Sequence, residues 1–269
     1  MNEEELIRKI TEKRDFSHLP AKDVELAFSH FENRQVSDKE KVRLTRELLH
    51  KVFGAFGSRK LLSLKDKSPE WILRKHLSTR ERMDVPSSSR CGQTRERIGF
   101  YDEIYKKILE KEKVVLDLGA GINGFSYDYF PRRVRYVAAE AVGQWVDLMN
   151  DYFRKEKIDG KAVHLSLFEL EKVKELIKKE KGSKKDKVVF LFKVLDSLEM
   201  LERDYSKKLL SEIAPLVSKV VLSFATESMN KRKRFKVGRG WILNYIKENF
   251  SVVDDFEIGS ERFVVFCKR

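Results

Sequence analysis

Two hydrophobic patterns divide the chain near residue 98. Before that point, apolar residues return every three or four positions, which is the spacing of one face of a helix. Ser37 followed by Glu40 has the pattern of a helix start, and Ser68-Pro69-Glu70 predicts another. We therefore expect residues 1–98 to form a helical domain. The helical spacing is clearest at Val42, Leu44, Leu48, Leu49 and Val52.

From residue 99 onward, short apolar runs alternate with helical segments. Strands that alternate with helices pair in parallel through right-handed crossovers. The turn Gly259-Ser260-Glu261 predicts that the last two strands form an antiparallel hairpin. An α/β sheet that ends in such a hairpin resembles the class I (Rossmann-like) methyltransferase fold, and we expect residues 99–269 to form that domain. The expected helices are 101–111, 143–156, 169–181 and 204–214, and the expected strands are 114–116, 134–139, 162–165, 188–192, 219–224, 251–258 and 262–267.

The net charge of +13 is concentrated in two segments. Residues 51–100 carry a net +7 and residues 226–241 a net +5, so the rest of the chain is nearly neutral. A concentration of this kind is typical of proteins that bind a polyanion such as nucleic acid. A solvated cationic surface without a partner is the alternative. Abundant Lys and Glu with only three Gln suggest a thermophilic source.

Cysteine, histidine and hydropathy patterns exclude several classes of protein. Cys91 and Cys267 are far apart, which excludes a zinc knuckle and a disulfide scaffold and favours a reducing cytoplasm. The five His residues have no metal-ligand spacing, so no metal is expected. No run approaches the roughly 20 apolar residues of a membrane helix, and residues 1–10 do not have the pattern of a secretory signal. We expect a cytoplasmic monomer.

The strongest motif is a glycine-rich turn after the first predicted strand. Glycines let the backbone bend sharply and approach a ligand closely. Gly119, Gly121 and Gly124 also match the dinucleotide fingerprint. Asp117 argues against a nicotinamide cofactor, because a carboxylate at that place would repel a pyrophosphate. It could instead accept hydrogen bonds from the cationic amino group of S-adenosyl-L-methionine, directly or through water.

Residues at the ends of the next two strands extend this candidate cofactor site. Glu140 ends the second strand, where a carboxylate can accept hydrogen bonds from both ribose hydroxyls, although a surface Glu is the alternative. Ser166 and Leu167 follow the third strand and are placed to border the adenine. The whole set is typical of a class I methyltransferase that uses S-adenosyl-L-methionine.

Four motifs follow one another along the chain: His76–Arg82, the glycine turn, Val189–Leu195 and the segment from Ser223 to Trp241. Their order resembles one family, the aminoglycoside-resistance 16S rRNA guanine-N7 methyltransferases. The resemblance covers residues 70–269 and, more loosely, the helical N-terminus. It implies S-adenosyl-L-methionine as cofactor, 16S rRNA in the small ribosomal subunit as substrate, and an N-terminal domain that helps to bind that subunit.

The resemblance leaves two candidates for the Arg that holds the cofactor carboxylate. The family's S-T-x-E-R motif matches Ser78 to Arg82 in sequence. Thr94 to Arg97 matches better in distance to the glycine turn, and an aromatic pair follows it at 100–101, as in the family. We favour Arg97 and retain Arg82, and the other of the two would contact RNA. A surface ion pair with a neighbouring Glu is the alternative for either.

Two departures from the family pattern affect the chemistry. The chain has Asn123-Gly124 where the family has Asn-Pro, and Lys193 to Asp196 stands where the family has Lys-x-Leu-Pro. Guanine N7 carries an in-plane lone pair, so positioning is most of its catalysis. An exocyclic amine such as cytidine N4 must lose a proton and needs an acceptor. Asp196 could be that acceptor, or it could cap the following helix together with Glu199.

Lys193 leaves the fourth strand toward the same edge of the sheet. It could contact the RNA or the target base, or it could be a lysine that reaches solvent at the sheet edge. A basic loop follows the fifth strand, and loops after parallel strands gather at the edge where a cofactor binds. Cations there would bind phosphates, and an aromatic ring could stack on a base. Trp241 is expected to be the first core residue of the next helix.

The sequence thus predicts an S-adenosyl-L-methionine-dependent enzyme that methylates a base nitrogen of 16S rRNA, with guanine N7 favoured and cytidine N4 as the alternative. A methyltransferase of a small molecule or protein would not need the two basic segments, and the acid–glycine–acid set argues against a non-catalytic RNA-binding assembly factor. The predicted catalytic residues are Lys193 and Asp196. The predicted cofactor-binding residues are Arg82, Arg97, Asp117, Gly119, Ala120, Gly121, Glu140, Ala141, Ser166 and Leu167. The predicted RNA-binding residues are Lys231, Arg232, Lys233, Arg234, Phe235, Lys236 and Arg239, with Arg59 and Lys60.

Overall fold

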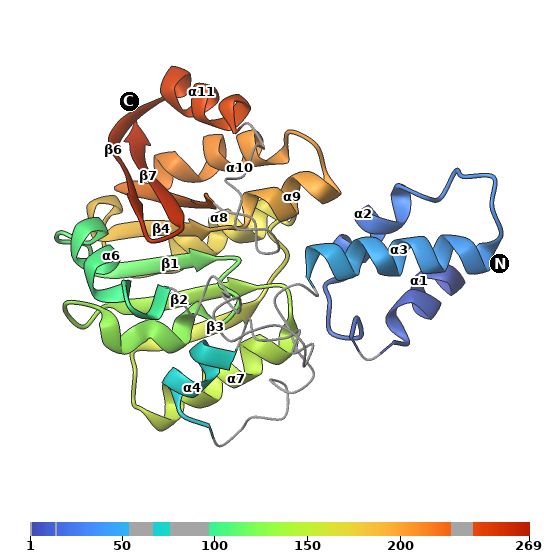
Figure 1. The fold of residues 1–269 in the computed structure, drawn as a ribbon, viewed down its shortest axis with the longest axis horizontal. Coiled ribbons are helices and arrows are strands. Elements are labelled where there is room, and N and C mark those ends of the chain that lie inside the picture. Colours follow the sequence, from blue (N-terminus) through green and yellow to red (C-terminus); the bar gives the residue numbers. More distant parts are fainter. Residues whose placement is uncertain (1, 14, 54–66, 76–96, 227–238) are drawn as a thin grey trace, which may run out of the picture.

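A computed structural model describes residues 2–13, 15–53, 67–75, 97–226 and 239–269 (Figure 1). A seven-stranded sheet forms its centre, in the order β3-β2-β1-β4-β5-β7-β6. The first five strands are parallel, and β7 lies antiparallel between β5 and β6. The predicted α/β class with a terminal hairpin is confirmed. The strands are β1 (Val114–Leu118), β2 (Arg135–Glu140), β3 (Gly160–His164), β4 (Lys187–Phe192), β5 (Lys219–Ala225), β6 (Phe250–Ile258) and β7 (Glu261–Lys268).

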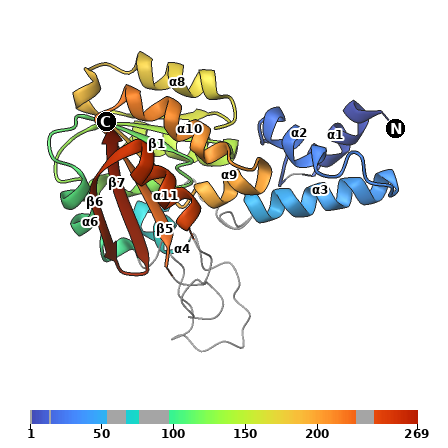
Figure 2. The same cartoon turned by 90° about the horizontal axis from the view of Figure 1, so that it is seen from above.

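Helices cover both faces of this sheet, as Figure 2 shows for α8 and α10 on one side and α6 on the other. Successive side chains of a strand point to opposite faces. Val115 accordingly packs in one core cluster and Leu116 in the other. One face carries α6 (Tyr101–Ile108), the 3-10 helix η3 (Asn123–Tyr129) and α7 (Gly143–Lys155), and the other carries α8 (Leu170–Lys179), α10 (Tyr205–Ile213) and α11 (Gly240–Asn249).

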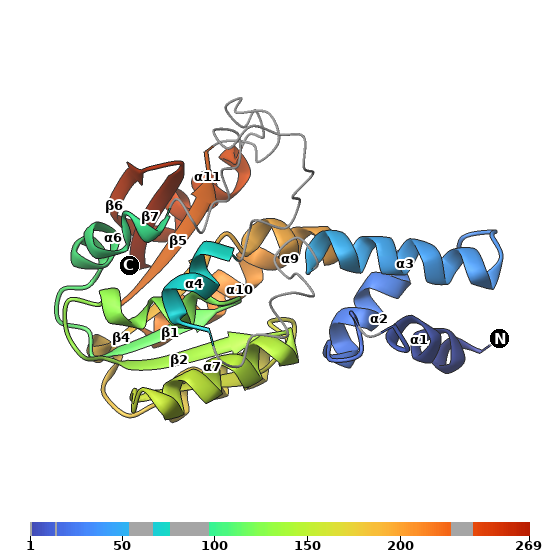
Figure 3. The same cartoon turned by 60° about the horizontal axis from the view of Figure 1, so that its bottom comes forward.

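The N-terminal helices extend the molecule to one side of the sheet (Figure 3). They are α1 (Glu3–Thr11), α2 (Ala21–Ser29) and α3 (Asp38–Val52), and each has a buried apolar face, as the spacing predicts. The C-terminal end of α3 lies against α9 (Leu195–Leu201), and Leu49 shares a core cluster with Leu198. The imidazole Nε2 of His30 lies 2.8 Å from the carbonyl oxygen of Leu201. The N-terminal helices are therefore packed onto the sheet's own helices.

A fourth N-terminal helix, α4 (Pro69–Lys75), lies elsewhere. Its residues Ile72 and Leu73 are buried in the cluster of η3 and α7, on the opposite face from α1–α3. The hydroxyl of Ser68 accepts a hydrogen bond from the backbone N–H of Trp71 at 3.3 Å, as expected of a helix start. Two short 3-10 turns, η4 (Lys184–Asp186) and η5 (Ala214–Leu216), complete the described elements. Within the described ranges, no helix is long and apolar enough to cross a membrane.

Two predictions about helix starts are wrong. Asp196 does not cap α9, which begins at Leu195 without a side-chain cap. Glu199 instead caps the next helix, because its carboxylate accepts hydrogen bonds from the N–H groups of Asp204 at 2.7 Å and Ser206 at 2.9 Å. Trp241 is not a core residue of α11 but is 37% exposed, and the buried face of that helix consists of Ile242 and Ile246.

Candidate functional site

The glycine turn begins where β1 ends and is held in left-handed backbone conformations. Gly119 has φ +72° and Gly121 has φ +56°. The N–H of Gly119 donates to the carbonyl oxygen of Ala139 at 2.8 Å, which ties the turn to β2. A Cβ at Gly119 would lie 2.5 Å from Cγ2 of Val194, whereas a Cβ at Gly121 would meet no atom within 4 Å. Close packing against Val194 therefore leaves no room for a side chain at position 119, whereas position 121 borders open space.

Asp117 supports this turn from the interior. Its Oδ2 accepts hydrogen bonds from the hydroxyl of Tyr136 at 2.6 Å and the side-chain amide of Asn123 at 2.7 Å. Its Oδ1 is buried without a partner among the described residues, and burial raises the pKa of the carboxyl. Asp117 is not among the residues that line the cavity described below. The predicted contact with a cofactor amino group would thus depend on Oδ1, directly or through water.

Glu140 lies at the predicted place, the end of β2, and faces the cavity. Its Oε2 accepts from the N–H of Gly121 at 2.7 Å, and its Oε1 accepts from the N–H of Val142 at 2.9 Å. Burial raises the pKa of this carboxyl, and the two backbone donors counteract part of that rise. A carboxylate has about four lone-pair sites. The two amides therefore fix the orientation of Glu140 while leaving lone pairs for two hydroxyls of a ligand.

Arg97 also lies in the cavity wall and is nearly completely buried. Its guanidinium forms a bidentate pair with Glu261 on β7, with N–O distances of 2.6 and 3.0 Å. The ammonium of Lys193 lies 3.5 Å from the same carboxylate. Burial alone would raise the pKa of Glu261, but Arg97 and Lys193 outweigh it and hold this pKa below its usual value. Two cations share one carboxylate, so this end of the cavity has a net positive charge.

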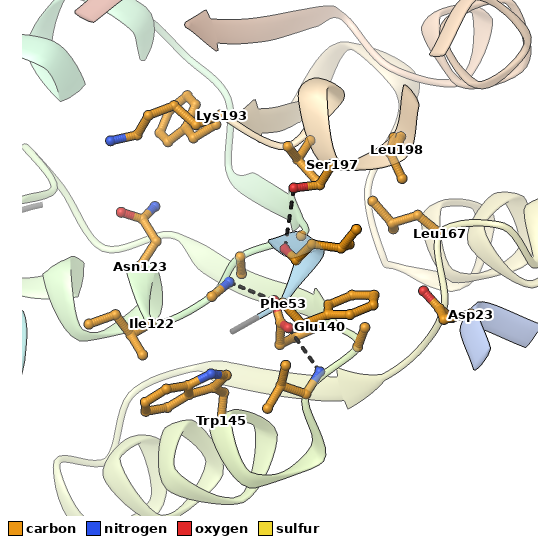
Figure 4. Close-up of a pocket in the computed structure, with 18 of the residues that line it drawn as sticks. Asp23, Phe53, Ile122, Asn123, Glu140, Trp145, Leu167, Lys193, Ser197 and Leu198 are labelled. Atoms are coloured by element: carbon orange, nitrogen blue, oxygen red, sulfur yellow. Dashed lines mark hydrogen bonds between the residues drawn. The ribbon is translucent and has the colours of Figure 1, made fainter. Parts of the chain in front are cut away.

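The cavity itself lies at the carboxyl edge of the parallel strands (Figure 4). It contains about 1000 Å³ of empty space when the open solvent at its mouth is included. The wall is formed by Arg97, Tyr101, Gly119, Ala120, Gly121, Ile122, Asn123, Glu140, Ala141, Val142, Trp145, Leu167, Phe168, Phe192, Lys193 and Val194, by Ser197, Leu198 and Leu201 of α9, and by Asp23, Val52 and Phe53 from the N-terminal helices.

Sequence reasoning missed the contribution of the N-terminal helices to this wall. Val52 and Phe53 end α3, and the hydroxyl of Ser197 donates to the carbonyl oxygen of Val52 at 3.5 Å (Figure 4). Asp23 comes from α2 and is 3% exposed. Its position on the apolar face of α2, beside Val24, is a signal that the sequence did contain.

The other predicted site residues have different environments. Leu167 and Ala141 line the cavity, whereas Ser166 is fully buried behind it and accepts a hydrogen bond from the N–H of Phe168 at 3.1 Å. Asp196 does not line the cavity; it accepts a hydrogen bond from Arg239 at 2.7 Å.

The predicted RNA-binding residues are mostly not described. The guanidinium of Arg239 lies 4.8 Å from the ring centre of Phe224, and its side chain is 10% exposed. Arg239 therefore has a packing role in addition to any contact with RNA. Arg82, Arg59, Lys60 and the segment Lys231, Arg232, Lys233, Arg234, Phe235 and Lys236 lie outside the described residues.

The strand order, the hairpin and the cavity at the carboxyl edge define a class I methyltransferase fold. Among solved structures, this chain is similar to the 16S rRNA methyltransferase RmtF in complex with S-adenosyl-L-homocysteine, with TM-score 0.74, 18% identity and 100% of both chains covered. It is also similar to an rRNA methylase from Escherichia coli, with TM-score 0.73, 18% identity and complete coverage of both chains. The 16S rRNA methylase RmtB gives TM-score 0.72 and 18% identity over 100% of this chain and 99% of its own.

These likenesses confirm the predicted resemblance at the level of the fold. At 18% identity, the activity must be argued from the residues of this chain. No family model matches the sequence, and no curated protein matches it.

Proposed function

We propose that this chain is an S-adenosyl-L-methionine-dependent methyltransferase that modifies a base nitrogen of 16S rRNA. The observation that carries this proposal is the order of groups along one cavity wall. Arg97 and Lys193 supply positive charge at one end, the glycine turn follows, and Glu140 lies beyond it. S-adenosyl-L-methionine has a carboxylate at one end and a ribose diol further along, so its groups match this order. RmtF, which has the same fold, was solved with S-adenosyl-L-homocysteine.

The residues present fit that cofactor. Arg97 would hold the cofactor carboxylate, Glu140 would accept hydrogen bonds from the ribose hydroxyls, and the backbone at Gly119 to Gly121 would allow close approach. The cofactor supplies an electrophilic methyl group on a sulfonium. The chain's own task is to hold that group and the target nitrogen in line and to exclude water, which is a positioning role.

Guanine N7 is the favoured target, with cytidine N4 as the alternative. N7 needs no proton acceptor, whereas N4 needs one within hydrogen-bond reach. Asp196, the candidate acceptor, is paired with Arg239 and lies outside the cavity wall. Lys193 does line the cavity and is the better candidate for a contact with the base or its phosphate. This arrangement favours a target that reacts without deprotonation.

The RNA would bind across two basic surfaces. Residues 1–98 would form a domain that binds the small subunit, and residues 231–239 would bind phosphates beside the methyl donor, with Phe235 stacking on a base. Two separated segments with net charges of +7 and +5 support this assignment. A ribosomal substrate would place the enzyme in the cytoplasm, where it would act as a monomer.

The test is methyl transfer from labelled S-adenosyl-L-methionine to purified small ribosomal subunits, followed by mass spectrometry of the nucleosides. We expect 7-methylguanosine. N4-methylcytidine would instead support the alternative and give Asp196 a catalytic role. Cofactor binding without any methylated nucleoside would contradict an RNA substrate, and no binding of S-adenosyl-L-homocysteine would contradict the enzyme itself.

A second measurement separates an RNA enzyme from a methyltransferase of small molecules or proteins. Binding to small subunits or to heparin should weaken steeply as salt rises, because Lys and Arg that neutralise phosphates release counterions. Absence of binding at low salt would favour a substrate without phosphates.

A further inference from the structure

One buried acid in the cavity has no role in the scheme above. Asp23 lies on α2, in the N-terminal part of the chain, yet it is 3% exposed and lines the cavity. Its Oδ2 is buried without a hydrogen-bond partner among the described residues. A buried carboxylate oxygen without a partner costs folding free energy, so a ligand that donates a hydrogen bond there would recover part of that cost.

The position of Asp23 along the cavity indicates which part of a ligand it would meet. Figure 4 shows Asp23 and Lys193 at opposite ends of the cavity wall, with Glu140 between them. If the amino-acid end of the cofactor binds near Arg97 and its ribose at Glu140, the next group along the molecule is the adenine ring. That ring presents an exocyclic amine at its far edge, and an amine is a hydrogen-bond donor.

We propose that Asp23 accepts a hydrogen bond from the exocyclic amine of the cofactor's adenine, so that the N-terminal helices select adenine over other bases. This inference rests on the proposed function. The lining of the cavity supports it, because apolar side chains in the wall suit the faces of a flat ring. These side chains include Val142, Leu167, Phe168, Leu198 and Leu201.

Ser166 also influences Asp23. Burial raises the pKa of the Asp23 carboxyl to about 6, and the hydroxyl of Ser166 counteracts part of that rise, so it favours the ionised carboxylate. Ser166 would therefore support the acid that contacts the adenine, rather than border the ring itself.

The segment that carries Asp23 is anchored to the methyltransferase fold. The carbonyl oxygen of His18 accepts a hydrogen bond from the N–H of Gly143 at 3.2 Å, at the first residue of α7. A Cβ at Gly143 would lie 3.2 Å from Cβ of His18, so the two segments are in close contact. Pro20, directly before α2, fixes the backbone between this anchor and Asp23. The position of Asp23 in the cavity therefore follows from packing of the backbone.

The experiment compares two ligands on the full-length protein by calorimetry. One is S-adenosyl-L-homocysteine, and the other is S-inosyl-L-homocysteine, which has an oxygen acceptor in place of the exocyclic amine. At pH 8, where Asp23 is ionised, we expect the wild type to prefer the adenine ligand by roughly tenfold or more, because the inosine oxygen would face a carboxylate that cannot donate. In Asp23→Asn, the amide can donate to that oxygen, so the preference should fall to within about threefold.

Glu25→Gln is the matched control, since it removes a carboxylate from an exposed position on the same helix. Its preference should equal that of the wild type. Asp23→Ala serves as a second variant that cannot donate, and it should lower affinity for the adenine ligand and weaken the preference for it.

The outcomes separate this inference from the proposed function. A wild type that binds both ligands equally well, or an Asp23→Asn variant that keeps the full preference, would overturn the role of Asp23 while leaving a methyltransferase in place. A wild type that binds neither ligand would overturn both.

Discussion

The two ends of the cavity differ in how their charges are satisfied. At the Arg97 end, two cations share the buried carboxylate of Glu261, and Asn123 accepts a further long hydrogen bond of 3.4 Å from Arg97. At the other end, Asp23 is buried, and its Oδ2 has no partner among the described residues. The charged groups at the first end are paired within the protein, whereas Oδ2 of Asp23 would gain its partner from a ligand. Substitutions at the two ends should therefore change stability in opposite directions.

The largest effect is expected at the paired end. Glu261→Gln should lower the free energy of unfolding by roughly 3–5 kcal/mol, because it leaves the buried guanidinium of Arg97 without its counter-charge. Urea denaturation at pH 7 measures this change. Asp255→Asn is the control, since Asp255 pairs with Arg262 on the same hairpin but both are about one-third exposed, and its cost should stay below about 1 kcal/mol. If Glu261→Gln and Asp255→Asn lowered the free energy of unfolding equally, the expected difference between the buried and the exposed ion pair would be contradicted.

At the Asp23 end, removing the charge should instead raise the free energy of unfolding. Burial raises the pKa of Asp23 from 3.8 to about 6, with Glu140 and Glu169 adding to the rise. The folded protein therefore holds this proton more tightly than the unfolded chain, so the ionised carboxylate destabilises the fold above pH 6. Asp23→Asn should raise the free energy of unfolding by up to about 3 kcal/mol at pH 8, since one pKa unit corresponds to 1.36 kcal/mol.

That gain should shrink as the pH falls from 6 toward 4, where the wild-type carboxyl takes up its proton. Urea denaturation of both proteins at pH 8 and pH 5 checks the sign and the slope. An Asp23→Asn variant that is less stable than the wild type at pH 8 would show that Asp23 has a cationic partner.

Between the two ends, the glycine turn contains one residue that packing requires and one that borders the open cavity. Gly119→Ala would place a Cβ 2.5 Å from Val194 in a left-handed conformation, whereas Gly121→Ala adds the same Cβ in open space. We expect Gly119→Ala to cost about 2–3 kcal/mol and Gly121→Ala about 1 kcal/mol from backbone strain alone. The loss of ligand affinity should be larger for Gly121→Ala than for Gly119→Ala. Calorimetry on the folded proteins would test this order.

The smallest effect is expected from a substitution that distinguishes contacts to the amino-acid end of the ligand from contacts to the rest of it. Arg97→Lys keeps the charge but loses the bidentate geometry, so affinity for S-adenosyl-L-homocysteine should fall by about tenfold. The affinity for 5′-methylthioadenosine, which lacks the amino-acid end, should be unchanged, because that ligand would not reach residue 97. An equal loss for both ligands would mean that Arg97 acts on the fold rather than on the carboxylate.

The sequence predicted the strands and the glycine turn well, because both depend on local patterns. All seven strands lie within two residues of the expected bounds at their N-terminal ends, and Glu140 falls at its expected strand end. Asp23 and Glu261 were missed as members of the site, since each reaches it through contacts with residues far away in the chain. The N-terminal helices were expected to help bind the ribosome. The position of Asp23 on the apolar face of α2 is a local signal that this acid is buried, but it does not show which cavity that face meets.

The helix starts show a different limit. Asp196 and Glu199 have the spacing of a capping box, but Glu199 turns toward the start of α10 instead. Asp196 is left to pair with Arg239, which comes from a segment 43 residues away. A local motif predicts which hydrogen bonds are available, and the tertiary structure decides which of them form.

The backbone of Lys193 has a consequence for dissecting the site. This residue has φ +57°, a conformation that glycine adopts without strain, and its N–H donates to the carbonyl oxygen of Ser223 at 3.1 Å. Lys193→Gly would therefore delete the ammonium while relaxing the main chain at the end of β4. The substitution would leave Arg97 as the remaining cation beside Glu261, so it separates the contribution of the Lys193 charge from that of the main-chain conformation at this position.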